Sequence, residues 1–322
     1  MNTAAARVTR SHRSLYETVI VVTRKTQLEG LVSRFNTVAQ ARFYLEHAGQ
    51  DFDSIQAAHT RYHSALDIVR RSLPRGTKNQ VVDRDMLPQM VIRESDLIVT
   101  VGQDGLVANT AKFVNGQPII AVNPDPQLFD GVLMPFTADT FRSTLDSTLR
   151  DSAELRHVTM AQAALADGQT LLGFNDLFIG ARSHVSARYC IEQDGVAEQQ
   201  SSSGIIVSTG AGSTGWLQSV YAGAAGVVEA LDGQVVTPPN RGRLPWDADY
   251  LVYSVREPFP SNATQTGLVF GIIRPDTPLM LDSQMSDFGV VFSDGVEQDK
   301  LDFNAGARVT ITLAEQKAKL VI

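Results

Sequence analysis

The feature that most constrains the fold of this chain is a short apolar run that ends in a glycine-bracketed acid. Residues 97–101 (LIVTV) are rich in β-branched residues, which is typical of a strand covered on both faces, as in a parallel sheet. Gly102 and Gly105 flank Gln103 and Asp104, and a helical pattern follows. Glycines let a backbone approach a ligand and present N–H groups to phosphate oxygens. Because open α/β sheets bind ligands at the carboxyl ends of their strands, we expect Asp104 to lie in a binding site; an ordinary helix turn capped by Asp104 is the alternative.

The elements around this strand alternate in type. The pattern predicts strands at 18–23, 80–83, 97–101 and 118–123, and helices at about 25–47, 54–73 and 138–152, with a further helix after Asp104. Strands that alternate with helices form parallel sheets through right-handed crossovers. We therefore expect an N-terminal Rossmann-like parallel α/β domain over residues 15–153.

From about residue 154 the pattern changes to consecutive strands separated by Asp-Gly turns. The predicted strands are 157–165, 176–181, 187–193, 204–209, 250–255, 268–273, 288–293 and 308–313. We expect a β-rich, β-sandwich-like domain over residues 154–322, with the last segment packing back on the first domain. Residues 232–249 are too rich in Gly and Pro for a strand and are long for a connection inside a compact domain; such segments are commonly lids, binding loops or disordered.

The charge balance and the cysteine count limit the partners. The 322 residues carry a formal net charge of -7, which argues against a general nucleic-acid or anionic-membrane surface. No apolar run approaches the length of a membrane-spanning helix. The single cysteine, Cys190, excludes an internal disulfide and a multi-thiolate metal site. The basic residues 1–13 are too short for a convincing presequence, so we expect a disordered tail and a cytoplasmic protein.

A second glycine-rich turn, STGAGSTGW, lies in the β-rich half at residues 208–216. Gly210, Gly212 and Gly215 satisfy the dinucleotide fingerprint G-x-G-x-x-G, so a nicotinamide dehydrogenase has to be weighed. That fingerprint requires a second strand, ending in an acid, after the helix. Here the Gly/Pro-rich loop follows the helix instead, which favours a chance match. The turn also lacks the Gly-Lys-Ser/Thr of a Walker A loop.

Two histidines share a face of the second predicted helix. His59 and His63 are four residues apart, as paired metal ligands on a helix are. Their neighbourhood, HTRYH, has no Glu between them and no third ligand nearby in sequence. A polar helix face is therefore the favoured interpretation, and no metal ligand is assigned.

The order of these features resembles the NAD kinase family, which is related in fold to the diacylglycerol and sphingosine kinases. The resemblance rests on an Asp in a glycine loop after a central strand, an Asn-acid pair opening the β-rich half, and the STGAGSTGW turn, its most specific part. It extends from about the first strand to the C-terminus. It implies an α/β domain with a Gly-Gly-Asp-Gly-Thr loop, a β-rich domain that binds the dinucleotide, and an active site between them.

The resemblance implies a role for three groups of residues. It makes Asp104 the catalytic carboxylate. The phosphate and nucleotide loop then consists of Gly102, Gln103, Gly105, Leu106 and Asn123. The dinucleotide-binding residues are then Asn175, Asp176, Thr214, Gly215, Trp216 and Ser219, and Asp294-Gly295 resembles the late Asp-Gly turn of the family.

The sequence departs from the family pattern at four places. Gln103 replaces the second glycine of the loop and Leu106 replaces its threonine; Ser203 stands at a usual aspartate, and NPDP at residues 123–126 replaces Asn-x-Gly. Each change removes a polar or backbone feature near phosphates or ribose.

The resemblance implies an ATP-dependent NAD kinase that phosphorylates the 2′-hydroxyl of the adenosine ribose of NAD to give NADP. Mg²⁺ or another divalent cation would accompany ATP, and a homo-oligomer, either dimer or tetramer, is expected. Two alternatives stay open: a kinase of the same fold that acts on a sugar, nucleoside or lipid, and a non-catalytic NAD(P)-binding protein, which Gln103 and Leu106 would motivate. The sequence does not decide between ATP and polyphosphate, or between NAD and NADH.

Overall fold

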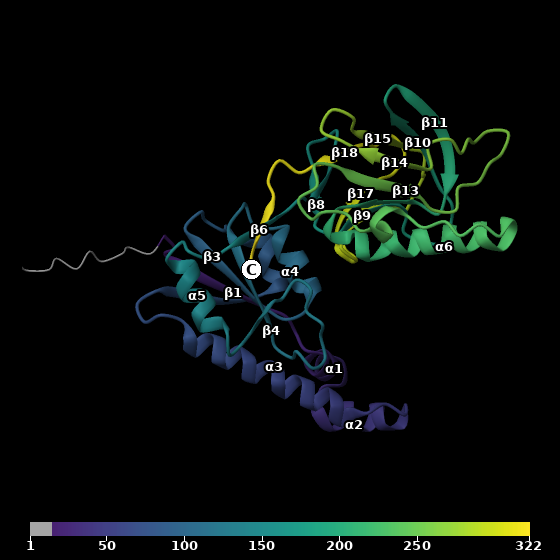
Figure 1. Cartoon of the computed structure of the whole chain (residues 1–322). Helices are drawn as coiled ribbons and strands as arrows, with labels where there is room; N and C mark the ends of the chain where they lie inside the picture. The colour runs from purple at the N-terminus through teal and green to yellow at the C-terminus, as the bar shows by residue number, and fades with distance from the viewer. Residues whose placement is uncertain (1–14) are drawn as a thin grey trace, which may run out of the picture. The chain divides into compact units, whose positions relative to one another are not determined.

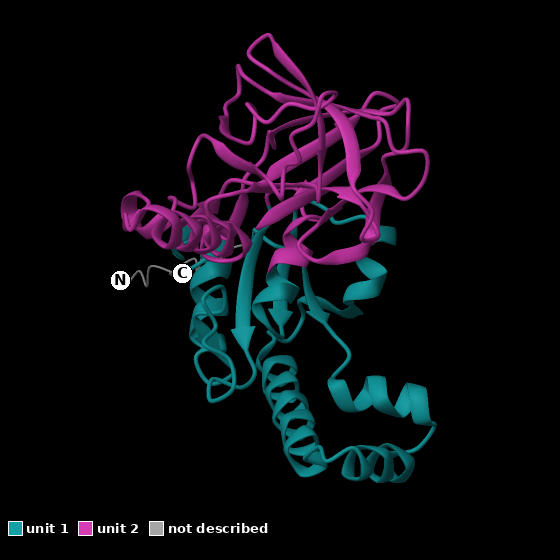
Figure 2. Cartoon of the chain, turned by 90° about the vertical axis from the view of Figure 1, so that its right-hand side faces the viewer, with its two compact units in different colours: residues 1–107, 117–155, 320–322 teal, residues 108–116, 156–319 magenta. Residues whose placement is uncertain are grey.

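The computed structural model describes residues 15–322, so the expected disordered tail at residues 1–13 lies outside the described residues. The chain divides into two compact units, which Figure 2 shows in different colours. Of the described residues, unit 1 comprises 15–107, 117–155 and 320–322, and unit 2 comprises 108–116 and 156–319.

One sheet has the strand order β2-β1-β3-β4-β19-β6, and β5 pairs with β4; Figure 1 labels β1, β3, β4 and β6. Strands β1 to β5 belong to unit 1, whereas β6 and β19 run across the boundary between the two units. The pairing is parallel from β2 through β1, β3 and β4 to β5. The strands are β1 (Thr18–Thr23), β2 (Lys78–Asp83), β3 (Asp96–Val101), β4 (Pro118–Asn123), β5 (Phe136–Thr137), β6 (Leu155–Val158) and β19 (Ala318–Val321). Both β3 and β4 are buried along their whole length, as expected for central strands covered on both faces.

Helices precede and follow these strands. They are α1 (Gln27–Phe35), α2 (Val38–His47), α3 (Phe52–Ser72), the 3-10 helix Arg84–Gln89, α4 (Asp104–Ala111) and α5 (Phe141–Leu149). The first three bury a small core of their own around Leu28, Leu45 and Phe52. The prediction of one helix over 25–47 is wrong: Asn36 ends α1 with a φ of 67°, and the Thr37 hydroxyl caps α2.

Unit 2 contains two antiparallel sheets. Their orders are β11-β10-β15-β18-β7-β8 and β14-β13-β12-β9-β16-β17. The strands are β7 (Ala161–Leu165), β8 (Thr170–Gly173), β9 (Asp176–Ala181), β10 (Ala187–Gln193), β11 (Val196–Ser202), β12 (Ile205–Ser208), β13 (Leu251–Val255), β14 (Phe270–Ile273), β15 (Leu279–Ser283), β16 (Gly289–Ser293), β17 (Val296–Asp302) and β18 (Arg308–Leu313). One apolar core takes residues from both sheets, which makes the unit a β-sandwich.

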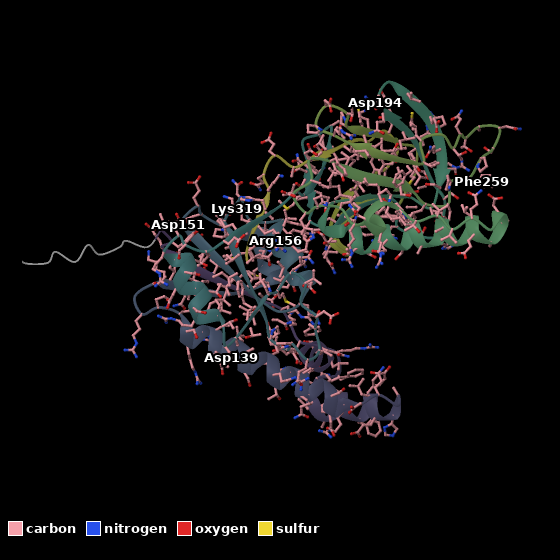
Figure 3. All side chains as sticks on the ribbon, viewed as in Figure 1. Asp139, Asp151, Arg156, Asp194, Phe259 and Lys319 are labelled. Carbon is pink, nitrogen blue, oxygen red and sulfur yellow. The ribbon has the colours of Figure 1, made fainter. Side chains whose placement is uncertain are left out.

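A two-residue turn closes one hairpin of unit 2. Asp194 and Gly195 both have positive φ, which closes the tight β10–β11 hairpin; Asp194, at its tip, is labelled in Figure 3.

The prediction of a single strand over residues 157–165 is wrong, because β6 ends at Val158 and β7 starts at Ala161. Between them the Thr159 N–H donates to the Trp246 carbonyl at 2.8 Å instead of continuing a ladder.

The glycine-rich turn has the wrong surroundings for a Rossmann site. Its strand, β12, lies between β9 and β13 and is antiparallel to both. A 3-10 turn (Ala211–Thr214) and α6 (Trp216–Asp232) follow, and residues 233–250 then form no strand. The G-x-G-x-x-G match is therefore a chance match. The predicted fold class, a parallel α/β domain followed by a β-rich domain, is confirmed. Among residues 15–322, no helix has both the length and the apolar character needed to cross a membrane.

Candidate active site

The glycine loop of unit 1 joins β3 to α4. The Gly102 N–H donates to the Val122 carbonyl at 3.3 Å and ties the loop to β4. The Leu106 N–H donates to the Gln103 carbonyl at 2.8 Å, which closes the first turn of α4 onto the loop. A Cβ at position 102 would lie 2.7 Å from the Leu106 Cδ2, so the Leu106 side chain would have to shift to admit any residue other than glycine. Leu106 itself is buried and packs beneath the loop.

Asp104 begins α4. The positive end of the helix dipole favours its carboxylate there. Its Oδ1 accepts a hydrogen bond of 2.7 Å from the Leu133 N–H, which fixes the orientation of the side chain. The residue is partly exposed. A carboxylate held in this way can accept a proton from a hydroxyl group that comes within hydrogen-bond reach.

A cavity of about 170 Å³ within unit 1 opens beside the loop. Gly102 and Gln103 form part of its wall, together with Arg24 and residues of α3 such as Tyr62. The Arg24 guanidinium donates to the Gln103 side-chain oxygen, and the Arg24 N–H donates to the Tyr62 hydroxyl at 3.1 Å. Gln103 therefore holds a cation on the cavity wall, which suits an anionic ligand such as a phosphate.

Asn123 and Asp125 hold the segment that follows β4, at residues 124–129. The Asn123 amide donates to the Phe129 carbonyl at 3.0 Å, and its oxygen accepts from the Asp125 N–H at 3.0 Å. The buried Asp125 carboxylate pairs with Arg61 at 2.6 Å. Both side chains thus hold the loop at residues 124–129, and the charge of Asp125 is already neutralised.

In unit 2, the Asn175–Asp176 pair lies at the start of β9. Three backbone N–H groups, those of Phe174, Asn175 and Asp176, donate to the Asp294 carboxylate at 3.0, 2.6 and 3.4 Å. Asp294 and Gly295 form the turn between β16 and β17, both with positive φ. The late Asp-Gly turn therefore clamps the backbone of the Asn-acid pair.

A buried lysine completes this cluster. The Lys112 ammonium donates to the Ser293 hydroxyl at 2.9 Å and to Asp299 at 3.2 Å, and lies 3.9 Å from Asp294. Burial raises the pKa of Asp294, although Lys112 and the three backbone donors oppose that rise. Burial and the neighbouring Asp294 raise the pKa of Asp176 to about 7. Near neutral pH, the Asp176 carboxyl can therefore both donate and accept hydrogen bonds.

The glycine-rich turn is seated on the same segment. The Thr209 N–H donates to the Asn175 carbonyl at 2.9 Å, and its hydroxyl donates to the Phe174 carbonyl at 2.6 Å. A Cβ at Gly212 would lie 1.9 Å from the Asn175 carbonyl oxygen, so this contact needs glycine. Gly212 therefore allows the glycine-rich turn to pack directly against the backbone of Asn175.

The remaining predicted dinucleotide residues lie at the start of α6. Thr214, Gly215 and Ser219 are exposed. Trp216 stacks on Phe178 with ring centroids 5.8 Å apart and planes 9° from parallel. Unit 2 thus brings Asn175 and Asp176 together with the turn, while Asp104 and the other loop residues belong to unit 1.

Two proteins of Oryza sativa subsp. japonica are similar to this chain in sequence. A probable NADH kinase is 25% identical over 228 residues, covering 63% of this chain and 64% of that protein. Probable NAD kinase 1 is 30% identical over 172 residues, covering 49% of this chain and 31% of that protein. The chain is thus similar in sequence to proteins named as NAD and NADH kinases. The matched segments span less than two thirds of the length of either relative, and no family model matches the chain.

Solved NAD kinase structures share the fold. Yeast NADH kinase complexed with NADH has a TM-score of 0.59 at 13% identity, covering 96% of this chain and 84% of that one. An NAD kinase from Archaeoglobus fulgidus in complex with ATP has a TM-score of 0.53 at 18% identity, covering 94% and 93%. At these identities the likeness shows the fold alone.

Sequence reasoning missed two charged residues next to the predicted ones. Lys112 follows an apolar stretch of the helix after Asp104, and a lone lysine in such a stretch is a signal for a buried partner. Arg24 directly follows the first predicted strand, at the carboxyl edge where ligands bind. The strand pattern is thus sufficient to predict that Arg24 lies at this edge of the sheet, whereas its hydrogen bond to Gln103 is seen only in the structure.

Proposed function

We propose that this chain is a member of the NAD kinase family and transfers the γ-phosphoryl group of ATP to the 2′-hydroxyl of the adenosine ribose of NAD, giving NADP and ADP. The observation that carries the proposal is the Asp104 carboxylate. It is fixed by the Leu133 N–H at the glycine loop of a chain that is similar in sequence to NAD and NADH kinases. A ribose hydroxyl is a poor nucleophile, and a carboxylate that accepts its proton makes it a better one.

In this proposal the hydroxyl proton passes to Asp104 as the ribose oxygen forms its bond to the γ-phosphorus and the bond to ADP breaks. Arg24, held by Gln103 on the cavity wall, contributes positive charge toward the phosphates. Gly102 lets the loop backbone pack closely against Leu106, which keeps the loop in place beside the cavity.

A divalent cation such as Mg²⁺ would enter with ATP and neutralise charge on the transferred group. Mg²⁺ is commonly bound by one or two carboxylates and the substrate phosphates, so the hard oxygen ligands of Asp104 fit it. Asp125 fits less well because it is buried and paired with Arg61.

The dinucleotide is assigned to unit 2. A carboxyl with a pKa near 7 can exchange hydrogen bonds with ribose hydroxyls or an amide, which supports a binding role for Asp176 beside Asn175. Thr214, Gly215 and Ser219 are exposed, and Trp216 offers an aromatic surface at the start of α6. A homo-oligomer, dimer or tetramer, stays a prediction.

The test is an assay of the purified full chain with Mg²⁺, using ATP or polyphosphate as donor and NAD or NADH as acceptor. NADP or NADPH is measured with an NADP-specific dehydrogenase. We expect product with ATP, and the two acceptors decide between NAD and NADH. Binding of NAD(P) without transfer from either donor would contradict the proposal and favour a non-catalytic binding protein. Phosphorylation of a sugar, nucleoside or lipid instead would favour the other kinase.

A further inference from the structure

Folding supplies the third ligand that the two histidines of α3 lack in the sequence. Glu29 of α1 joins His59 and His63, and one ligand atom from each of the three lies within 4.8 Å of the others. Among the described residues 15–322, this is the one group of His, Cys, Asp and Glu side chains with metal-ligand spacing. We propose that Glu29, His59 and His63 form a binding site for a first-row divalent cation of the zinc class.

The geometry of the group is close to that of a metal site. The His63 Nε2 lies 3.2 Å from the Glu29 Oε1. Two ligands at about 2.1 Å from a tetrahedral zinc ion are about 3.4 Å apart, so this pair already has nearly the required separation. The His59 and His63 rings have centroids 4.4 Å apart, and both lie on one face of α3.

A hydrogen bond orients the third ligand. The His59 Nδ1 lies 2.8 Å from the Thr26 hydroxyl, and Thr26 is the N-cap residue of α1. When Nδ1 donates its proton to this hydroxyl, the Nε2 lone pair is the one left for a metal. Histidine ligands are commonly held in this way by a partner on the second ring nitrogen.

The Glu29 carboxylate is also prepared for this role. Its Oε2 accepts from the Thr26 N–H at 2.7 Å in a capping box, which leaves Oε1 directed at His63.

The chemistry of the ligand set selects the metal. Two imidazole nitrogens and one carboxylate suit zinc and related ions, whereas Mg²⁺ and Ca²⁺ prefer oxygen ligands. The site would be distinct from the cation that accompanies ATP, and the inference does not rest on the proposed function. A metal ion bound by these three residues would link α1 to α3. Because Thr26 and His59 also line the cavity beside the glycine loop, it would stabilise part of the cavity wall.

The test titrates chelator-treated full-length protein with Zn²⁺ by calorimetry and with Co²⁺ by visible absorption. We expect one Zn²⁺ per chain and the absorption of four-coordinate Co²⁺. His63→Ala should weaken Zn²⁺ binding at least about 100-fold, since loss of an outer-shell partner alone costs about 10- to 100-fold. His47→Ala, which removes an exposed histidine of α2 outside the group, should change it less than about twofold.

Glu29→Gln is the second variant, because glutamine keeps the capping box and hence the fold of α1. It should weaken Zn²⁺ binding at least about tenfold even if His63→Ala does not fold. Zn²⁺ should also slow amide hydrogen exchange over residues 27–72 of the parent but not of the variant. Absence of binding, displacement of Zn²⁺ by excess Mg²⁺, or unchanged affinity in Glu29→Gln would overturn the proposal.

Discussion

The raised pKa of Asp176 predicts that one substitution stabilises the protein in a pH-dependent way. Burial and the Asp294 charge raise this pKa from 3.8 to about 7. A group with a raised native pKa contributes stability that is fully present below its unfolded pKa and is lost as the pH rises through the native value. The parent therefore loses stability between about pH 4 and pH 7 at this residue. The Asp176→Asn variant should not lose stability over this pH range, because its amide resembles the neutral carboxyl and does not ionise.

The magnitude follows from the two pKa values. Each pH unit of difference corresponds to about 1.36 kcal/mol, which gives a ceiling of about 4 kcal/mol above pH 7. Because the side chain is partly exposed to water, we expect the realised gain to be smaller, about 1–2 kcal/mol. The difference between variant and parent should shrink toward zero near pH 4.

The assay is urea denaturation of both proteins at a series of pH values. Both tryptophans of the chain, Trp216 and Trp246, belong to unit 2, so their fluorescence reports the unfolding of the unit that contains Asp176. Asp276→Asn, at an exposed carboxylate of the same unit, is the control and should follow the parent at every pH. A stability gain that is independent of pH, or that grows toward acid pH, would refute the reasoning.

Three further predictions concern the clamp around the Asn-acid pair. Gly212→Ala should destabilise unit 2 by about 2–3 kcal/mol in urea denaturation, because its Cβ would lie 1.9 Å from the Asn175 carbonyl oxygen; Gly223→Ala in α6, where nothing lies within 4 Å, should be neutral or stabilising, and equal effects would contradict the packing. Asp294→Ala should cost about 3–5 kcal/mol, since it leaves three backbone donors without their acceptor and removes one of the two carboxylates beside Lys112, whereas the exposed Asp287→Ala should cost less than about 0.5; a similar loss in both would count against the clamp. Asn175→Ala should weaken NAD binding in calorimetry at an unchanged melting temperature, and unchanged affinity would remove Asn175 from the proposed pocket.

Local sequence patterns were sufficient for the framework of unit 1. Strands 18–23 and 118–123 were predicted with the bounds that the structure shows, because a buried parallel strand is a continuous apolar run between breakers. The helix break at Asn36 was not predicted. Both neighbouring segments are helical in pattern, and the decision lies in a left-handed residue followed by a threonine cap.

Elements defined by distant partners were not accessible in this way. The polar strands β11 and β17 carry little apolar alternation, and they are strands because β10 and β16 pair with them. Likewise, α6 has an apolar pattern that suggests a buried face, yet only Leu217 is buried. The same limit applied to Glu29, which lies 30 residues before His59 and meets it only after folding.

The assignment of Asp104 as the proton acceptor is tested most directly by Asp104→Asn. The amide keeps the size of the side chain and its oxygen can still accept from the Leu133 N–H, but it cannot take up the hydroxyl proton. The measurement is the rate of NADP formation by parent and variant, together with the dissociation constant for NAD. We predict a rate at least about a hundredfold lower in the variant, with NAD binding unchanged. Full turnover by Asp104→Asn would contradict the account.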